Sequence, residues 1–283
     1  IPQEFLIDKQ DGIREPQGMS GVRLESKVHI VTASTSAVQN IIKCADRTNL
    51  HVEEIVLQQI ASAGSVLSDD EKELGVILVD IGGGTTDIAI FSKGSLAYTG
   101  VIPLGGDQVT NDIAIGLRTP TSDAEKIKVN HGCALASMIQ KDETIEVSSV
   151  GGRKDRLVSR NILSEIIQAR MEEIFSLVRD EVVRAGFEGR CASGLVVSGG
   201  TSEMTGLAEL GEQIFDLPIR KGIPDKIAGG LKDMVKKPTF ATGVGLVQYG
   251  VERVKSDRTA YFRKNKSGKK VTSRFRSFIE DMF

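Results

Sequence analysis

The sequence contains no tryptophan, and aromatic residues make up only 5% of its 283 positions. Proteins that bind single-stranded nucleic acid stack bases on aromatic side chains, so this scarcity argues against a nucleic-acid partner. Only three cysteines are present, Cys44, Cys133 and Cys191, and they lie far apart without the spacing of a zinc site. The cysteines therefore favour a reducing compartment over a disulfide framework.

Long apolar runs are also missing. No segment stays apolar over the roughly 20 residues that a membrane-spanning helix requires, and no signal peptide is recognisable. Hydrophobic residues make up 40% of the chain, charged residues 26%, and the formal net charge is −2. These values are typical of a globular protein of one or two domains. The chain begins with Ile1 rather than methionine, so we expect it to be a segment of a longer protein.

The most informative stretch is VILVDIGGGTTDIAIF, from Val76 to Phe91. An apolar run ends at Asp80, glycines and threonines follow, and a second apolar run begins at Ile88. This pattern predicts a strand, a tight turn and a strand, unlike the strand-to-helix turn of a P-loop. Glycines lack a Cβ and let backbone N–H groups approach phosphate oxygens, although an ordinary glycine-rich hairpin would read the same way. The predicted phosphate-binding residues are Gly82, Gly83, Gly84, Thr85 and Thr86.

Two carboxylates flank this turn, Asp80 before it and Asp87 after it. Mg²⁺ keeps several of its water ligands and needs few protein carboxylates. Asp80 and Asp87 are therefore both candidates to hold a hydrated Mg²⁺ ion.

A second glycine element, GLVVSGGTSEMTGL, runs from Gly194 to Leu207. It predicts a short strand that ends in a glycine pair and leads into a helix. A helix N-terminus presents unpaired N–H groups and a partial positive charge, which attract anions. Alone the pattern recurs in many α/β folds, but two such glycine turns could clamp one nucleotide. The predicted residues are Gly199, Gly200, Thr201 and Ser202.

The two motifs, in this order, resemble the phosphate-2 and adenosine elements of the superfamily of actin, the DnaK-type chaperones and the sugar kinases. The resemblance implies ATP and Mg²⁺ as ligands. It assigns Mg²⁺ to Asp80, the β- and γ-phosphates to residues 83–85, and the ribose and adenine to residues 199–202. It also implies an adenosine contact on the long helix between the motifs, for which Glu165 is the first candidate and Ser164 the second.

Longer stretches are similar to the FtsA family of bacterial cell-division proteins. IPQEFLIDKQDGI and GVRLESKVHIV are similar to the inserted subdomain of that family, and SDAEKIKVNHGCALAS, VSSVGGR, SGGTSEMTGL and TGVGLVQYG follow in the family's order. The resemblance covers essentially the whole chain. It implies an α/β, actin-like (ribonuclease H-like) fold with mixed sheets, flanking helices and part of the inserted subdomain. It also implies that the first part of the nucleotide domain, with its phosphate-1 turn, lies outside this chain.

The resemblance and the apolar periodicity together give an expected organisation. Expected domains are residues 1–50, part of the inserted subdomain; 51–77 and 231–252, the remainder of the first actin-like domain; 78–230, the second actin-like domain; 253–270, a basic linker; and 271–283, an amphipathic helix. Expected helices cover residues 36–47, 58–67, 108–117, 122–132, 160–186, 205–215 and 240–250, the fourth with a capping box of Ser122 and Glu125. Expected strands include residues 27–32 and 52–57, and residues 68–73 are expected to form a solvated turn.

The last residues combine bases with an apolar stripe. Ten lysines and arginines lie between Arg253 and Arg276, with Asp257 the single acid among them. Apolar residues then recur at helical spacing, which predicts an interfacial helix after a flexible basic tether. A terminal helix packed on its own domain is the alternative, but the FtsA resemblance implies membrane targeting. The predicted membrane-binding residues are Arg274, Phe275, Phe278, Ile279, Met282 and Phe283.

The FtsA resemblance implies an ATP-binding protein that self-assembles and anchors FtsZ filaments, through the FtsZ C-terminal tail, to an anionic membrane surface. It places the protein on the cytoplasmic face of the bacterial inner membrane at the division site, where later division proteins are recruited. A small-molecule kinase and a DnaK-like chaperone are the alternatives, but we see neither a catalytic acid cluster nor a β-rich peptide-binding domain. No catalytic residue is assigned. A weak ATPase activity stays open, with a water-positioning residue on the helix of Gln58 and Gln59 or, alternatively, only plain helix surface there.

Overall fold

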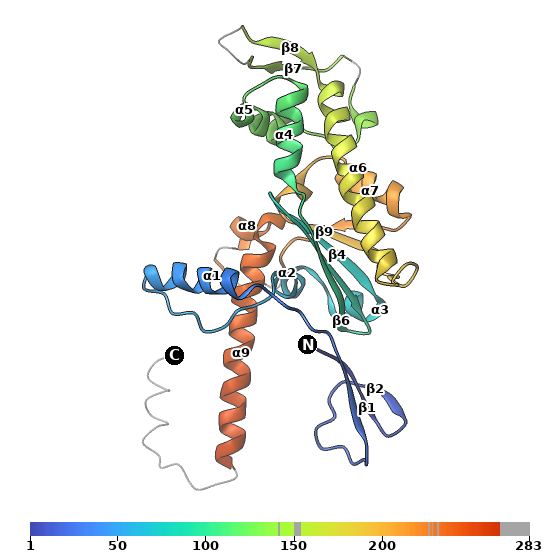
Figure 1. The fold of residues 1–283 in the computed structure, drawn as a ribbon, viewed down its shortest axis with the longest axis vertical. Coiled ribbons are helices and arrows are strands. Elements are labelled where there is room, and N and C mark those ends of the chain that lie inside the picture. Colours follow the sequence, from blue (N-terminus) through green and yellow to red (C-terminus); the bar gives the residue numbers. More distant parts are fainter. Residues whose placement is uncertain (141, 150–153, 226, 228, 231, 267–283) are drawn as a thin grey trace.

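The computed structural model of the protein describes residues 1–140, 142–149, 154–225, 227, 229–230 and 232–266. At its centre lies a five-stranded sheet in the order β10-β9-β4-β5-β6 (Figure 1). The strands are β4 (Val76–Ile81), β5 (Thr86–Ser92), β6 (Ser95–Ile102), β9 (Leu195–Ser198) and β10 (Ile219–Lys221). β4 pairs antiparallel with β5 and parallel with β9, so the predicted mixed sheet and the predicted strand–turn–strand hairpin are both confirmed.

Every residue of β4 is buried because helices cover both faces of the sheet. Successive side chains of a strand point to opposite faces, and β4 accordingly contributes to two cores. Ile77, Val79 and Ile81 belong to the larger core, whereas Val76 and Leu78 belong to the smaller one.

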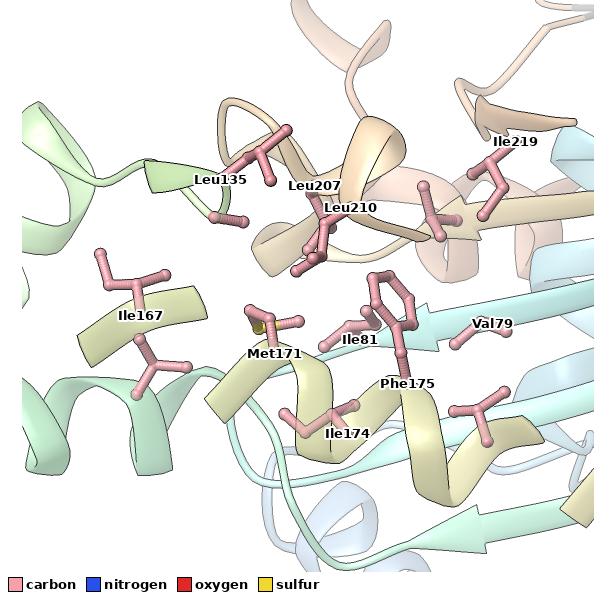
Figure 2. Packing of buried hydrophobic residues seen from close by; sticks show 14 of the residues in the cluster. Val79, Ile81, Leu135, Ile167, Met171, Ile174, Phe175, Leu207, Leu210 and Ile219 are labelled. Atoms are coloured by element: carbon pink, nitrogen blue, oxygen red, sulfur yellow. The ribbon is translucent and has the colours of Figure 1, made fainter. Parts of the chain in front are cut away.

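The larger core lies between the sheet and helices α6 (Arg160–Arg184) and α7 (Leu207–Phe215). Figure 2 shows Phe175 and Ile174 of α6 beside Val79 and Ile81 of β4. The ring of Phe175 meets that of Phe215 edge to face, with centroids 5.8 Å apart. This packing fixes α6 against the sheet.

The smaller core lies on the other face, where α2 (Gln58–Val66) and α9 (Ala241–Lys266) pack together. Their backbones come so close that a Cβ on Gly245 would lie 1.8 Å from the carbonyl oxygen of Ala61. Ser65 of α2 also donates to the carbonyl of Ala241 at 2.7 Å. α2 and the start of α9 therefore form one rigid unit against the sheet.

A lobe at one end of the molecule contains shorter elements packed around the first half of α6 (Figure 1). These are α4 (Gly106–Gly116), α5 (Thr121–His131), a 3-10 helix η1 (Ala136–Met138), β7 (Thr144–Val147) and β8 (Arg156–Ser159). β7 and β8 form a two-stranded antiparallel sheet. Short helices outside this lobe are α3 (Asp69–Leu74), α8 (Lys232–Val235) and the 3-10 helices η2 (Gly200–Glu203) and η3 (Pro238–Phe240).

The N-terminal residues form a separate three-stranded sheet in the order β2-β1-β3. Its strands are β1 (Pro2–Ile7), β2 (Gln10–Ile13) and β3 (Leu24–Val28), and they are followed by α1 (Thr35–Arg47). Gln3 joins this sheet to β6, because its side-chain amide donates to the carbonyls of Leu96 and Ala97 at 3.0 and 3.1 Å.

Several local predictions are wrong. Residues 52–57 form no strand, because no other strand pairs with them; Glu54 instead accepts hydrogen bonds from Tyr249 and Arg253 of α9. The predicted turn at 68–73 contains α3, since Ser68 and Glu71 form a capping box that begins a helix. The predicted strand at 27–32 ends at Val28, because its partner β1 begins at Pro2.

Two helix ends also differ from the prediction. α5 begins at Thr121, which places Ser122 inside the helix, so no capping box with Glu125 forms. α9 continues to Lys266, so the first part of the predicted flexible tether is helical. Arginine and lysine are good helix formers and extend a helix that is already fixed by packing at Ala241. The last four residues of the motif VSSVGGR, 150–153, and the whole tail 271–283 lie outside the described residues.

An ion pair fastens α3 to the edge strand β10. Arg220 donates from Nε to Glu71 Oε1 at 2.6 Å and from Nη2 to Oε2 at 2.7 Å. These bonds from Arg220 hold the pKa of the Glu71 carboxyl below its usual range. Because the pKa is lowered in the folded state, the stabilisation exists above the unfolded-state pKa and disappears as the pH falls through the folded-state pKa.

We expect Glu71→Gln to lower the free energy of unfolding by about 1 kcal/mol at pH 7, as measured by urea unfolding. The difference from the wild type should begin to shrink as the pH falls below about 4, near the unfolded-state pKa, and should disappear once the pH is below the lowered folded-state pKa. Glu73→Gln is the control: Glu73 pairs with Arg14, and both side chains are more than half exposed. Its effect should stay within a few tenths of a kcal/mol. Equal effects of the two variants would contradict the assignment.

Candidate functional site

The two glycine turns predicted from the sequence lie side by side. β4 and β9 are parallel neighbours, so their carboxyl ends reach the same edge of the sheet. There the carbonyl of Gly82 accepts hydrogen bonds from Thr201 Oγ1 at 3.0 Å and from the backbone N–H of Gly106 at 2.9 Å. The first turn, the second turn and the N-terminus of α4 therefore meet at one carbonyl group.

This meeting requires glycine at specific positions. Gly199 has a φ of +80°, and a Cβ there would lie 2.5 Å from Asp80 Oδ1 and 2.5 Å from the carbonyl oxygen of Ile81. A Cβ on Gly106 would lie 2.6 Å from Thr201 Oγ1. The three backbones approach each other only because side chains are absent at these points.

A cavity of about 500 Å³ opens beside the two turns. That volume is in the range of pockets that hold small-molecule ligands and cofactors, about 300–1,000 Å³. Its lining comes from the first glycine turn, the start of α4, the last turns of α5, the start of α6 and η2. The lining residues are Gly82, Gly83, Gly106, Asp107, Glu125, Lys128, Val129, Asn130, Gly132, Arg160, Gly200, Thr201, Glu203, Met204 and Thr205.

Four of the predicted nucleotide residues line this cavity: Gly82, Gly83, Gly200 and Thr201. Gly84 and Thr85 are exposed at the tip of the first turn. The remaining predicted residues of the two turns, Thr86, Gly199 and Ser202, do not line the cavity but stabilise the turns. Thr86 donates to the carbonyl of Leu104 at 2.8 Å and Ser202 to that of Gly199 at 2.7 Å, while Gly199 allows the close approach described above.

Neither candidate on α6 lines the cavity. Glu165 is exposed and accepts a hydrogen bond from Asn161 at 2.7 Å, whereas Ser164 is buried and donates to the carbonyl of Cys133 at 2.7 Å. Arg160, at the start of the same helix, reaches the cavity instead. Its guanidinium is oriented by Glu143 Oε2 at 2.6 Å and by the carbonyl of His131 at 2.9 Å.

The sequence patterns did not indicate the charged side chains that α5 contributes to the cavity lining, Glu125 and Lys128. Lys128 donates to the carbonyl of Gly106 at 2.9 Å and to Thr110 at 2.8 Å, and it forms an ion pair with Glu125 at 2.7 Å. Burial raises the pKa of the Glu125 carboxyl, but hydrogen bonds from Lys128 and Thr110 outweigh burial and lower it. Glu125 and Lys128 are three residues apart, so they share one helix face; that spacing was the available signal.

The two carboxylates of the hairpin lie directly opposite each other, since Asp80 pairs with Asp87 in the β4–β5 register. Both are buried, with 5% and 7% of their surface exposed. Burial, and then the nearby charge of Asp80, raise the pKa of Asp87 against the hydrogen bond from Thr85 that lowers it. A cation beside the pair would offset this repulsion.

The donor set fits Mg²⁺ better than a cation that needs a protein cage. Over the described part of the chain, no group of three or more histidine, cysteine, aspartate and glutamate side chains could hold a metal. Mg²⁺ needs only one or two carboxylates because it keeps its waters. Gln59 adds a buried acceptor: its amide nitrogen donates to Asp87 Oδ1 at 2.9 Å, while its Oε1 has no protein partner. A bound water would satisfy that oxygen.

The helix-surface alternative for residues 58 and 59 is wrong for one of them. Gln58 is exposed, but Gln59 is only 3% exposed and contacts Asp87. The predicted membrane-binding residues Arg274, Phe275, Phe278, Ile279, Met282 and Phe283 lie outside the described residues. Among the helices that the structure describes, none has the length and apolar character required to cross a membrane.

Comparison with known proteins yields two family matches. The model of the family described as cell division protein FtsA matches residues 77–245, and the model of the SHS2 domain inserted in FtsA matches residues 1–32. The second match confirms that part of the predicted inserted subdomain is present.

Curated relatives agree with these matches. The cell division protein FtsA of Pseudomonas aeruginosa is 54% identical over 253 residues, covering 89% of this chain and 60% of its own length. FtsA of Neisseria meningitidis is 43% identical over 287 residues, covering 100% of this chain and 69% of its own length. The chain thus spans about three fifths to two thirds of the relatives that it matches.

Among solved structures, MreB5 of Spiroplasma citri bound to ADP is similar, with a TM-score of 0.63, 18% identity, and coverage of 80% of this chain and 68% of that one. At this identity the likeness shows the fold alone. The predicted actin-like class with mixed sheets and flanking helices is confirmed.

Proposed function

The chain belongs to the FtsA family of cell-division proteins, and from this premise we propose that it binds ATP and Mg²⁺ between its two glycine turns and uses them to control assembly. The observation that carries the nucleotide proposal is the hydrogen bond from Thr201 Oγ1 to the Gly82 carbonyl at 3.0 Å. It brings together two elements that lie 119 residues apart in the sequence, beside a cavity of suitable size.

The cavity suggests an orientation for the nucleotide. Backbone N–H groups of residues 83–85 suit the phosphates, because they present partial positive charge at the tip of the first turn. The N–H groups of Gly82 and of Gly106 and Asp107 at the start of α4 already donate to backbone carbonyls. Asp80 and Asp87 would hold Mg²⁺ through its waters, and the ion would supply charge neutralisation to the β- and γ-phosphates. At the other end, the carboxylate of Glu125, held by Lys128, offers a hydrogen-bond acceptor to a ribose hydroxyl, and Arg160 and Met204 offer a surface for the base.

We extend the proposal to an adaptor that links FtsZ filaments to the membrane. Family membership supports this role, with the FtsZ C-terminal tail on residues 78–230, copies of the chain as assembly partners, and later division proteins recruited to the assembly. Residues 253–270 and 271–283 are proposed as basic linker and membrane-targeting helix, with Phe275, Phe278 and Ile279 inserted into the cytoplasmic leaflet at the division site.

Energetics favour assembly as the switch. Each fully buried apolar side chain contributes about 1.5–3 kcal/mol, partial insertion gives less, and each base near anionic lipid adds about 1 kcal/mol at best. One such tail binds reversibly, whereas many tails on one polymer bind with a multiplied effective concentration. An ATP-dependent polymer would therefore hold the membrane, while a monomer would leave it.

Co-sedimentation with anionic liposomes tests the adaptor proposal. The full-length protein should pellet with liposomes in the presence of Mg·ATP and should carry FtsZ filaments with it. A variant that ends after Lys266 should stay in the supernatant with and without nucleotide. Pelleting that needs neither the tail nor ATP would overturn the proposal, as would a polymerisation-deficient variant that pellets as strongly as the wild type.

A small-molecule kinase is less well supported by the site. The acids at the cavity are Asp107, Glu125 and Glu203, and Lys128 and Thr110 already engage Glu125. The unpaired Oε1 of Gln59 is compatible with slow hydrolysis, because an amide oxygen can orient a water molecule. ATP is therefore proposed chiefly as a ligand for assembly.

A further inference from the structure

One face of α2 contacts both carboxylates of the candidate Mg²⁺ site. Gln59 donates to Asp87, and Ser62, three residues later, donates from Oγ to Asp80 Oδ2 at 2.8 Å. Residues three apart share a helix face. Because Gln59 and Ser62 are both almost fully buried, these two contacts are shielded from bulk water.

A second hydroxyl reaches the same carboxylate from α9. Thr242 Oγ1 lies 2.8 Å from Ser62 Oγ and 3.4 Å from Asp80 Oδ2. A hydroxyl has a single proton to donate, and that of Ser62 goes to Asp80. Thr242 therefore donates to the oxygen of Ser62, which completes a chain from Thr242 through Ser62 to Asp80. Hydrogen bonds in such a chain strengthen each other.

Both hydroxyls act on the same oxygen of Asp80. Oδ2 accepts the hydrogen bond from Ser62, which Thr242 supports by donating to Ser62 and by lying 3.4 Å from the same oxygen. Oδ1 faces the second glycine turn, where a Cβ on Gly199 would lie 2.5 Å away. The carboxylate is thereby fixed with one oxygen tied to the helices and the other turned toward the edge of the sheet where the two glycine turns meet. A ligand to a metal-bound water needs this kind of fixed orientation.

We infer that Ser62 and Thr242 are positioning residues for Mg²⁺, which hold Asp80 in the orientation that accepts a hydrogen bond from a metal-bound water. The inference rests on the proposed Mg·ATP site. It adds that the metal affinity depends on two hydroxyls supplied by helices on the far side of the sheet from α6. Removing either hydroxyl leaves Asp80 in place but frees its rotation.

The chain offers a matched control on the same two helices. Ser65 is also fully buried on α2, and its hydroxyl shares its proton between the carbonyls of Ser62 and Ala241, at 3.0 and 2.7 Å. It contributes to the α2–α9 contact, but none of its hydrogen bonds goes to Asp80. Ser65→Ala therefore reports the structural cost of losing a hydroxyl from this interface.

Fluorescent ATP binding to the full-length protein tests the inference, with Mg²⁺ titrated at fixed nucleotide and with a parallel series in EDTA. Ser62→Ala and Thr242→Val should raise the Mg²⁺ concentration for half-maximal binding by about 10-fold, the lower end of the range for lost supporting contacts at metal sites. ATP affinity in EDTA should stay at the wild-type value. Thr242→Ser, which keeps the hydroxyl, should restore Mg²⁺ dependence, and Ser65→Ala should leave it unchanged.

Three other results would overturn the positioning role or the proposed function. Wild-type Mg²⁺ dependence in Ser62→Ala and Thr242→Val would overturn the positioning role. An equal loss of affinity with and without Mg²⁺, shared by Ser65→Ala, would show a merely structural role and overturn it too. If the wild type itself binds no ATP, the proposed function fails. If the wild type binds ATP in a Mg²⁺-dependent way and the two hydroxyl variants show the same Mg²⁺ dependence, the further inference alone fails.

Discussion

Replacing Gly245 with alanine is expected to lower the free energy of unfolding by about 3 kcal/mol or more, and replacement with valine by still more. A Cβ at this position would lie 1.8 Å from the carbonyl oxygen and 2.3 Å from the carbonyl carbon of Ala61. Both atoms belong to the backbone of α2, so no side-chain rotation relieves the overlap and the two helices must move apart. Separation would also break the bonds of Ser65 and Thr242 across the same contact.

Urea unfolding of Gly245→Ala against Gly243→Ala measures this effect. Gly243 lies in the same helix, but a Cβ there would meet no atom within 4 Å. Since alanine is favoured over glycine inside a helix by roughly 0.5–1 kcal/mol, Gly243→Ala should be neutral or stabilising. Equal stability of the two variants would show that α2 and α9 are farther apart than described.

Replacing Gly199 with alanine should weaken ATP binding by at least about 100-fold, or roughly 2.8 kcal/mol. Its backbone, with φ of +80° and ψ of 168°, lies in a region that is essentially restricted to glycine. A Cβ would also press on Asp80 Oδ1 and on the carbonyl of Ile81, each at 2.5 Å. The second turn would therefore move away from the first, and the carboxylate that is proposed to hold Mg²⁺ would be displaced.

Equilibrium ATP binding measures the loss, and thermal unfolding of the neighbouring variant Gly200→Ala controls for a general effect of alanine in this turn. A Cβ on Gly200 would meet only Thr239 Oγ1, at an ordinary 3.7 Å. Gly200→Ala should therefore unfold close to the wild-type temperature, whereas Gly199→Ala should unfold well below it. Wild-type ATP affinity in Gly199→Ala would contradict the proposed geometry.

The hairpin and the strand before the second glycine turn could be predicted because their signals are local. An apolar run ending at Asp80, three glycines and a second run from Ile88 determine a strand–turn–strand whatever surrounds them. The opposition of Asp80 and Asp87 follows from that register. By contrast, residues 52–57 carry the same kind of apolar signal and form no strand, since a strand also requires a partner that the local sequence does not specify.

The rest of the site depends on how distant elements pack. Lys128, Glu125 and Arg160 reach the cavity because α5 and the start of α6 lie beside the glycine turns, and no pattern within either helix states this. Glu165 is the sequence-based candidate for the adenosine contact on α6, but Arg160 lines the cavity instead. Successive residues of a helix are rotated by 100°, so the two side chains leave the helix in different directions. Helix propensity explains why α9 extends to Lys266 despite its high charge.

The most direct test of the central claim, that one adenine nucleotide lies between the two glycine turns, is photocrosslinking of the full-length protein with 8-azido-ATP and Mg²⁺, with the adducts mapped by mass spectrometry. The proposed orientation places the base beside the end of α5 and η2, so adducts should fall within residues 125–132, at Arg160 or within 200–205, and excess ATP should suppress them. Adducts confined to other parts of the chain, or adducts that ATP does not suppress, would contradict the account.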